Sequence, residues 1–378
     1  SSDSWPIYIS LQKDGILFKM RRTQDLPDKE SATMFFQDCK LSHQAQITGI
    51  SHSVKEILPP DLLDLTQLQK EANIRYGYTA SEVYDIAQSL YEKKLISYPR
   101  TSSRYLTEDV FDSLSPIMAH LLSWELFPAA KGTGGIDISC LSRHVINSEK
   151  ANVHHAIIIT GIRPGNLSEK EMQVYRLVAG RMLEAFMAPC RIETTNVEAV
   201  CAAQHFKAEQ TRIIEAGWHD VFMHSDMVPK SGYSVNELPE VKKGDNLNVC
   251  GCNMVHKKEL PVDPFTDAEL VEYMEQNGLG TVSSRTNIIR TLVNRKYIRY
   301  SGKYIVPTPK GMFTYETIRG KKIADTSLTA DWEKQLAGLE SGMITRQDFL
   351  NRIRTLAKEM TDDIFNTYSQ KEKVSILK

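Results

Sequence analysis

Residues 95–106 read Leu-Ile-Ser-Tyr-Pro-Arg-Thr-Ser-Ser-Arg-Tyr-Leu. Tyr98 offers a phenolic oxygen, and Pro99 stiffens the backbone behind it. Arg100 and Arg104 bring two fixed positive charges to the same turn. A phenol has a pKa of about 10, so an attack on phosphorus needs cations that favour the phenolate and stabilise charge on the phosphoryl oxygens. The combination indicates a phosphate-attacking site.

A second interpretation of this stretch is structural. Tyrosine before proline is common at strand ends and turns, where the ring packs into a core, and a nearby arginine is often only solvated. Two distant segments bear on the choice. Residues 152–160 read Asn-Val-His-His-Ala-Ile-Ile-Ile-Thr, and residues 278–286 read Gly-Leu-Gly-Thr-Val-Ser-Ser-Arg-Thr.

The three segments, in this order, resemble the motifs of type IA DNA topoisomerases, most closely the topoisomerase III branch. That family typically has Tyr-Pro-Arg-Thr/Ser-Asp, then Ala-His-His/Glu-Ala-Ile, then Gly-Ile-Gly-Thr/Arg-Pro-Ser/Ala-Thr. The resemblance extends to residues 65–73, 191–197 and 328–333 and covers nearly the whole chain.

The resemblance implies an isomerase that cleaves and rejoins single-stranded DNA. Tyr98 would attack a backbone phosphate, form a 5′-phosphotyrosyl link and release a 3′-hydroxyl. Transesterification conserves the bond energy, so the strand can be resealed without ATP after another strand passes. Arg100 would stabilise the developing charge, and His154 would donate a hydrogen bond to the phosphate. The alternative for His154 is a structural cap at the end of a helix or strand.

The third segment is expected to contact DNA. Gly278 and Gly280 would let the backbone approach closely, while Ser283, Ser284 and Arg285 offer hydroxyls, amides and a charge near a helix N-terminus. The alternative is that Gly-Leu-Gly is simply a turn that joins two helices.

Further DNA contacts are expected near the tyrosine. Arg104 and Tyr105 would line the same groove, with the ring stacked on a base. His155 is also a candidate contact, although next to His154 on a regular strand it would point elsewhere.

Composition agrees with a multidomain protein that lacks membrane spans. The chain has 378 residues, which suggests about two to four domains, and 41% of them are hydrophobic. No run approaches the roughly 18 apolar residues of a membrane helix, and no signal peptide is visible, so a soluble cytoplasmic protein is expected. The net charge is −1. Phosphate binding would therefore need local clusters, namely the two arginines near Tyr98, Lys257 with Lys258, and residues 285–299.

Six cysteines are scattered along the chain, at positions 39, 140, 190, 201, 250 and 252. This distribution favours reduced thiols in a reducing compartment. Cys250 and Cys252 with His256 lack a second cysteine pair, so no metal site is expected there.

Hydrophobic patterning predicts a β region interrupted by helices. Short mixed runs predict strands over residues 4–57, and strand-like alternation returns over 191–255. Helical spacing covers residues 62–94, with Thr79 as the expected N-cap, and residues 168–187.

The last part of the chain shows a helix that starts at Thr266, a tight turn at 278–280, and a second helix. Two short strands, 297–300 and 303–306, follow and are joined at Ser301-Gly302. This order is typical of a winged helix, a common nucleic-acid-binding arrangement that also serves in protein docking.

The expected fold class is α+β multidomain, and the resemblance implies a toroidal type IA topoisomerase core. Residues 1–57 and 190–260 would form a β-rich arch, and residues 58–189 a helical domain that carries the catalytic tyrosine. Residues 261–378 would form the C-terminal portion of a winged-helix-like DNA-binding domain.

Two features depart from the family pattern. Ser102 stands where the family has aspartate, which puts a proton-transfer role at this position in doubt. In the family an N-terminal Toprim domain holds Mg²⁺ through a Glu and an Asp-x-Asp motif, and nothing before Trp5 supplies these carboxylates. We therefore expect a chain that begins inside the β-rich domain, needs the Toprim domain of the same protein as its partner, and is inactive alone.

Two other functions stay open. Another tyrosine strand transferase, such as a recombinase or relaxase, would want a wider Arg/His set or a metal-binding His triad, and neither is visible. The other function is that of a winged-helix protein that binds nucleic acid without catalysis. The sequence does not distinguish relaxation from decatenation, and it fixes neither DNA preference nor oligomeric state.

Overall fold

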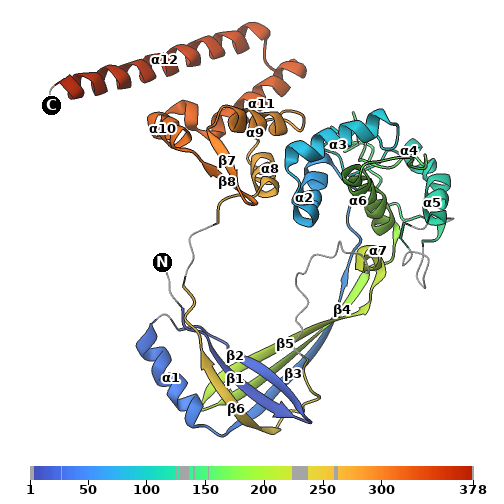
Figure 1. Ribbon diagram of the computed structural model, residues 1–378, viewed down its shortest axis with the longest axis vertical. Helices are drawn as coiled ribbons and strands as arrows, with labels where there is room; N and C mark the ends of the chain where they lie inside the picture. The colour runs from blue at the N-terminus through green and yellow to red at the C-terminus, as the bar shows by residue number, and fades with distance from the viewer. Residues whose placement is uncertain are drawn as a thin grey trace. The chain divides into compact units, whose positions relative to one another are not determined.

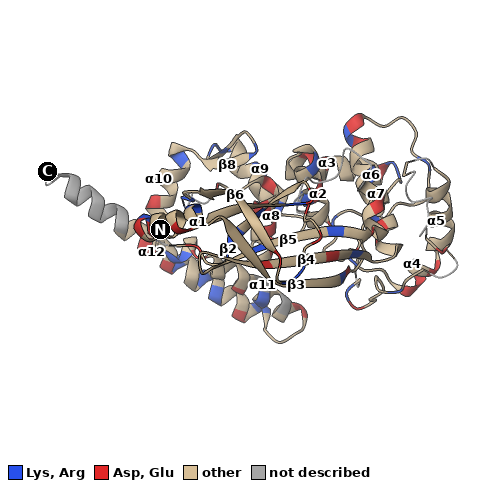
Figure 2. Ribbon diagram, turned by 90° about the horizontal axis from the view of Figure 1, so that it is seen from below, with Lys and Arg blue, Asp and Glu red and all other residues tan. Residues whose placement is uncertain are grey.

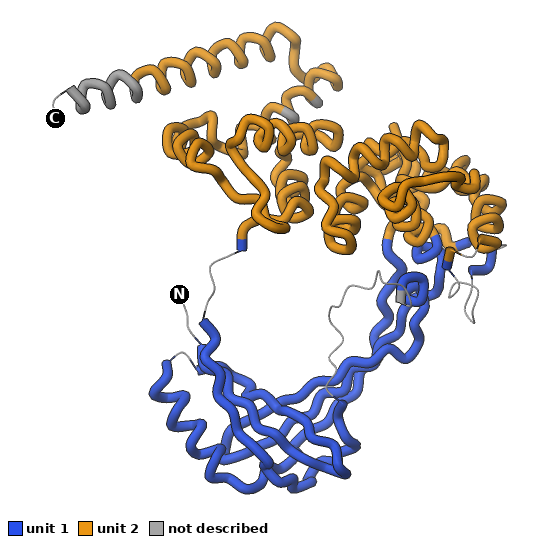
Figure 3. Tube along the Cα trace, viewed as in Figure 1, with its two compact units in different colours: residues 1–60, 127–141, 183–263 blue, residues 61–126, 142–182, 264–378 orange. Residues whose placement is uncertain are grey.

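The computed structural model describes residues 4–26, 28–124, 126–127, 136–138, 141–151, 153–223, 237–258 and 263–376. Figure 1 shows how their helices and strands follow one another. Asn152 of the second motif and Cys140 lie outside the described residues. The chain separates into two compact units (Figure 3): unit 1 is 1–60, 127–141 and 183–263, and unit 2 is 61–126, 142–182 and 264–378. The three-domain division stays a prediction.

Six antiparallel strands of unit 1 close into a barrel in the order β1-β2-β5-β4-β3-β6. Ile7, Ile9 and Leu11 alternate with more exposed residues and are fully buried inside it, because successive side chains of a strand point to opposite faces. Strands predicted within residues 4–57 and 191–255 are confirmed. They are β1 Ile7–Lys13, β2 Ile16–Arg22, β3 Gln44–Ile57, β4 Cys190–Cys201, β5 Gln204–Glu215 and β6 Asn246–Met254.

The prediction of strands throughout residues 4–57 is wrong at Lys29–Leu41, which forms helix α1. Asp28 caps this helix, since its side chain accepts a hydrogen bond from the Ser31 backbone N–H at 2.7 Å. The same bond lowers the pKa of the Asp28 carboxyl. Ala32 and Cys39, seven residues apart, are the buried residues of the helix. Only this narrow stripe is apolar enough to signal a helix, which explains the error.

The strands predicted over residues 191–255 are also interrupted, by two short helices. Gly217–His219 forms a short 3-10 helix, η3, and Asp220–Met223 forms helix α7. Gly217 adopts φ +53°, and a Cβ there would lie 2.4 Å from the Pro189 carbonyl oxygen. The Trp218 indole Nε1–H donates to the Ile57 carbonyl at 2.9 Å, which fixes the far end of β3.

Unit 2 is mainly helical and contains a two-stranded sheet. The helix predicted at 168–187 is confirmed as α6, whose last turn belongs to unit 1. Thr79 and Thr266 are confirmed as N-caps, each within a capping box. The elements are α2 Leu65–Tyr76, α3 Ala80–Glu92, α4 Glu108–Asp112, α5 Leu114–Ser123, α6 Glu169–Phe186, α8 Asp267–Gln276, α9 Arg285–Asn294, β7 Ile298–Ser301, β8 Tyr304–Pro307, α10 Pro309–Ile318, η4 Lys322–Ala324, α11 Thr326–Glu340 and α12 Arg346–Ile376.

Helix α3 shares one core with α8, α9 and the β7–β8 hairpin, and α2 packs on α3 and α8. Buried polar contacts cross this core. The Gln69 side-chain amide donates to the Ala80 carbonyl and to the Thr286 hydroxyl, both at 2.9 Å. Asp267 accepts from the Tyr300 hydroxyl at 2.8 Å. The order helix, turn, helix and hairpin agrees with the sequence, while its winged-helix character stays a prediction.

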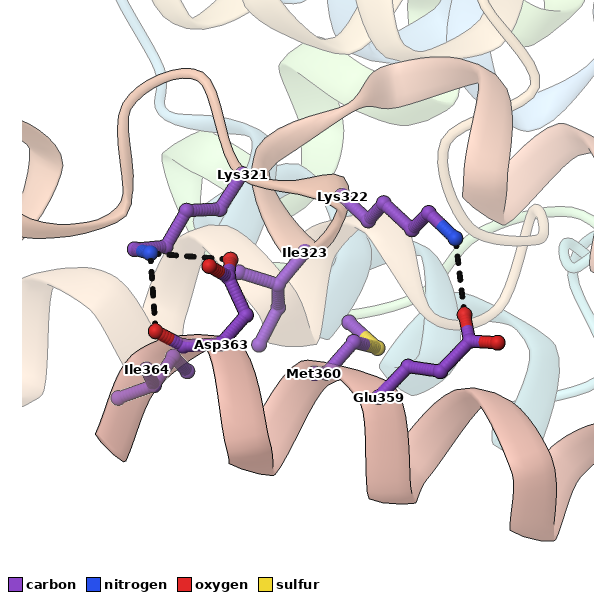
Figure 4. A pocket seen from close by; sticks show the side chains of 7 residues that line it. All are labelled: Lys321, Lys322, Ile323, Glu359, Met360, Asp363 and Ile364. Atoms are coloured by element: carbon purple, nitrogen blue, oxygen red, sulfur yellow. Dashed lines mark hydrogen bonds and ion pairs between the residues drawn. The ribbon is translucent and has the colours of Figure 1, made fainter. Parts of the chain in front are cut away.

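Helix α12 is held to η4 by ion pairs. Lys321 pairs with Asp363 at 2.9 Å and Lys322 with Glu359 at 2.8 Å, and apolar side chains between them line a slot of about 210 Å³ (Figure 4). Basic and acidic residues both occur along α12 (Figure 2). Within the described part of the chain, no helix combines the length and the apolarity that a membrane span needs.

The barrel core provides a test of the assigned strand faces. Leu11→Ala should lower the free energy of unfolding by about 2–5 kcal/mol, because it removes a fully buried side chain. Leu17→Ala on neighbouring β2, where the side chain is 58% exposed, should change it by less than about 0.5 kcal/mol. Urea denaturation followed by circular dichroism measures both. Equal losses would contradict the assignment of Leu11 to the interior.

Candidate active site

The tyrosine segment is anchored by backbone pairing to the second motif. Lys94 ends α3 with φ +60°, and the buried Leu95 and Ile96 follow. The Ser97 N–H donates to the Ile158 carbonyl at 2.8 Å, and Ile96 forms an isolated antiparallel bridge with Ile159. Tyr98 therefore follows a buried, hydrogen-bonded anchor.

Tyr98 itself is half-buried and lies between two rings. Its ring centroid is 4.5 Å from that of His154, at an interplanar angle of 43°, and 5.4 Å from that of Tyr91, edge-on at 78°. The Thr101 hydroxyl donates to the His154 carbonyl at 3.0 Å, which holds the histidine beside the tyrosine. The structure thus brings two of the three predicted catalytic side chains into contact, and the His154 ring is exposed.

Arg100, the third predicted catalytic residue, retains unused hydrogen-bonding capacity. Its guanidinium lies over the Tyr84 ring, 5.1 Å from the centroid, and one terminal nitrogen makes a long 3.4 Å contact with Gln88. Its Nε is buried and has no hydrogen-bond partner among the described residues. A buried donor left unpaired costs about 1–3 kcal/mol, so this arrangement favours an added acceptor such as a phosphate oxygen.

Arg104 is held by a carboxylate that sequence reasoning missed. Its Nε donates to Asp64 at 2.7 Å, and the Asp64 side chain is only 2% exposed. The other Asp64 oxygen caps α2 by accepting from the Gln67 N–H at 2.7 Å. Burial opposes the charge of Arg104, but the hydrogen bond and attraction from Asp64 outweigh it and raise the pKa of Arg104. An N-cap aspartate could have been found from the sequence, whereas its distant partner could not.

Tyr105 and His155 both make contacts within the chain. The Lys150 ammonium lies 4.9 Å from the Tyr105 ring centroid, so a cation contacts the ring that was expected to stack on a base. The Tyr105 carbonyl accepts from the Ala156 N–H at 2.9 Å. One His155 ring nitrogen lies 2.7 Å from the Ala156 carbonyl oxygen, so the imidazole contacts the backbone of the next residue.

The Gly-Leu-Gly segment is a tight turn with φ +64° at Gly278 and +69° at Gly280. A Cβ at Gly280 would lie 2.9 Å from the Ser284 hydroxyl oxygen. That hydroxyl accepts from the Thr281 N–H at 2.8 Å and closes the turn before α9. Ser283 is exposed, and its hydroxyl is 3.2 Å from that of Thr281. Turn geometry alone thus accounts for both glycines and for Ser284.

Arg285 differs from its predicted role as a phosphate contact. Its side chain is turned into the fold and is 10% exposed, with an ion pair to Glu275 at 3.3 Å and a hydrogen bond to the Leu279 carbonyl at 3.3 Å. The Thr66 hydroxyl donates to the same Glu275 oxygen at 3.2 Å. Arg285 therefore stabilises the turn, and its charge is balanced inside the molecule.

Three arginines of the expected basic clusters are paired in this way. Arg290 pairs with Asp85 at 2.9 Å, so Arg104, Arg285 and Arg290 each have a carboxylate partner. Ser102 beside the tyrosine is exposed. Among the residues whose structure is described, no group of three or more His, Cys, Asp or Glu side chains is arranged to hold a metal ion.

The Asp64–Arg104 pair can be tested by a double-mutant cycle with Asp64→Asn and Arg104→Gln. Asparagine keeps the helix cap and removes the charge. Because Arg104 is partly exposed, we expect a coupling free energy of about 1 kcal/mol in urea unfolding. Additivity within about 0.3 kcal/mol would show that the pair does not stabilise this segment.

Comparison with known proteins identifies relatives along most of the chain. A family model described as DNA topoisomerase matches residues 1–351. DNA topoisomerase 3 of Bacillus licheniformis is 32% identical over an alignment of 348 positions, and the match covers 85% of this chain and 47% of the relative. DNA topoisomerase 3 of Shouchella clausii is 30% identical, over 93% of this chain and 51% of the relative. The chain thus spans about half the length of these relatives.

A solved structure, full-length topoisomerase I from Thermotoga maritima, is similar in fold with a TM-score of 0.69. The match covers 98% of this chain and 59% of that one at 21% sequence identity, so it bears on fold alone. The family match and the relatives agree with the family resemblance of the sequence. The chain therefore belongs to the type IA DNA topoisomerase family and is similar to its topoisomerase III members.

Proposed function

We propose that Tyr98 is the nucleophile of a reversible DNA transesterification that changes DNA topology without ATP. The phenolic oxygen would form a bond to phosphorus while the bond from phosphorus to the 3′ oxygen breaks. The products are a 5′-phosphotyrosyl link and a 3′-hydroxyl, and the reverse step rejoins the strand. The observation that carries this proposal is the contact between the ring of His154 and that of Tyr98, which lies two residues in sequence before an arginine whose buried Nε has no partner among the described residues.

Arg100 would supply the electrostatic part of catalysis. A guanidinium stays charged at any working pH and donates several hydrogen bonds in one plane, which suits phosphoryl oxygens. Its packing over Tyr84 fixes the guanidinium in place before DNA arrives. Such preorganised donors are most effective where charge develops in the transition state.

His154 would contact the scissile phosphate as a hydrogen-bond donor. Its ring is exposed and in contact with Tyr98, while its backbone is fixed by Thr101. Single-stranded DNA is the proposed substrate, with further contacts from Arg104, Tyr105 and Ser283, and from the backbone at Gly278 and Gly280. Arg285 is not among these proposed DNA contacts, because Glu275 balances its charge.

In the whole protein we expect a toroidal arrangement with a gate that opens at the tyrosine, and a Toprim domain as partner. Mg²⁺ would be bound by that domain. The described residues of this chain do not fit such an ion, since no cluster of three His, Cys, Asp or Glu ligands occurs among them. No step proposed here uses the metal, and residues 1–378 alone should not relax supercoiled DNA.

The nucleophile can be tested by covalent trapping. The protein used is this chain fused to a Toprim domain, in the presence of Mg²⁺. A single-stranded oligonucleotide labelled at its 3′ end should become attached to the protein, because the link is to the 5′ phosphate of the downstream piece. Tyr98→Phe should abolish the labelled band in denaturing gels and leave DNA affinity nearly unchanged.

Tyr91→Phe is the matched control, because that ring touches Tyr98 and should keep the adduct. An adduct that survives Tyr98→Phe would rule out this nucleophile. DNA binding with no adduct from the unmodified sequence would favour the winged-helix binding protein instead.

Arg100 can be tested in the same fusion. Arg100→Ala should slow adduct formation by about 100- to 1,000-fold, as removal of one transition-state donor typically does. Arg352→Ala, at an exposed position on α12, should leave the rate within about twofold. Single-turnover kinetics at saturating oligonucleotide separate this effect from weaker binding. An unchanged rate would remove Arg100 from the proposed chemistry.

A further inference from the structure

Three cysteine side chains meet at one side of the barrel in unit 1, which contains none of the residues used in the proposed chemistry. Cys39 lies on α1, Cys201 ends β4, and Cys252 lies on β6. Cys39 and Cys201 are 0% and 1% exposed, whereas Cys252 is only partly buried. All three belong to, or pack against, the same hydrophobic core.

The packing of α1 on β6 places Cys252 beside Cys39. The Cys252 Sγ lies 4.0 Å from the carbonyl oxygen of Phe36, which is three residues before Cys39 and therefore on the same face of α1. Side-chain hydrogen bonds connect the Cys39 thiol with the thiols of Cys201 and Cys252. Cys39 thus stands between the other two.

The hydrogen bonds separate the ionisation of these thiols. Donation from Cys39 lowers the pKa of Cys252, and lowers that of Cys201 to about 6. The same bonds, together with burial, raise the pKa of Cys39. Cys39 and Cys201 are shielded from solvent, so Cys252, the partly exposed member whose pKa is lowered, is the thiol of this cluster that a solute can reach.

We propose that Cys252 is an oxidation site for hydrogen peroxide and that Cys39 is its resolving thiol. The Cys252 sulfur attacks one peroxide oxygen, the O–O bond breaks, and the released hydroxide takes up a proton, which leaves a sulfenic acid and one water. Cys39 sulfur then attacks Cys252 sulfur, and the departing hydroxyl takes the Cys39 proton as a second water. The resulting disulfide joins α1 to β6 covalently, and a dithiol reductant reverses it.

Cys250 offers a matched control on the same strand. The β1–β6 register shifts between Ser10 and Leu11, whose partners are Gly251 and Val249, so Cys250 is the extra residue of a bulge. It is exposed, and its sulfur lies 3.9 Å from the Gln12 side-chain oxygen. Exposure without a neighbouring thiol should not lead to an internal disulfide.

The test is hydrogen peroxide treatment of the reduced 378-residue chain, followed by alkylation and peptide mass spectrometry. The unmodified sequence and Cys250→Ser should both yield a Cys39–Cys252 crosslinked peptide that disappears with dithiothreitol. Cys39→Ser should yield a dimedone-trapped sulfenic acid at Cys252 and no crosslink.

Absence of the Cys39–Cys252 peptide from the unmodified sequence would overturn the proposal, and that measurement needs no variant to fold. A Cys39–Cys201 disulfide that persists in Cys252→Ser would also overturn it. Neither result depends on DNA cleavage, so the proposed function stands or falls separately.

Discussion

Backbone pairing between the tyrosine segment and the histidine segment is the constraint on which the site depends. Ser97 donates to Ile158, and Ala156 donates to Tyr105 in the return direction. Each such bond contributes only about 0.5–1.5 kcal/mol, yet the buried apolar residues between them exclude water and keep the pairing in register. Two side chains from distant parts of the sequence therefore meet with little freedom to separate, which is the preorganisation that catalysis needs.

The first turn of α2 extends this constraint to the third motif. Asp64 holds Arg104 and caps the helix, while Thr66 donates to the carboxylate that pairs with Arg285. Most of the arginines near the motifs are thus balanced within the chain, in keeping with its net charge of −1. Arg100 is different because part of its guanidinium has no partner among the described residues. The distinction between arginines with a carboxylate partner and one with an unpaired buried donor exists only in three dimensions.

Much of the local structure could be predicted because its causes are local. Capping boxes at Thr79 and Thr266 indicate the starts of two helices. The alternation of buried and more exposed residues indicates strand β1. Helix α1 was missed because its apolar stripe is too narrow to outweigh the strand-like runs on both sides. The motifs indicated Tyr98, Arg100 and His154. They did not indicate Asp64, Glu275 or the internal pairing of Arg285, since pairing across tens or hundreds of residues leaves no periodic trace in sequence.

The pairing of β3 with β4 has a consequence for how the chain folds. These neighbours are antiparallel along their whole length, from Gln46 opposite Val200 to Ile57 opposite Cys190, yet residues 58–189 separate them. Closing so long a loop in a disordered chain costs entropy before any strand contact is gained. Helices formed early within that insert would shorten the span that has to be closed. We infer that ring closure of the barrel follows, rather than precedes, compaction of the segment that carries Tyr98.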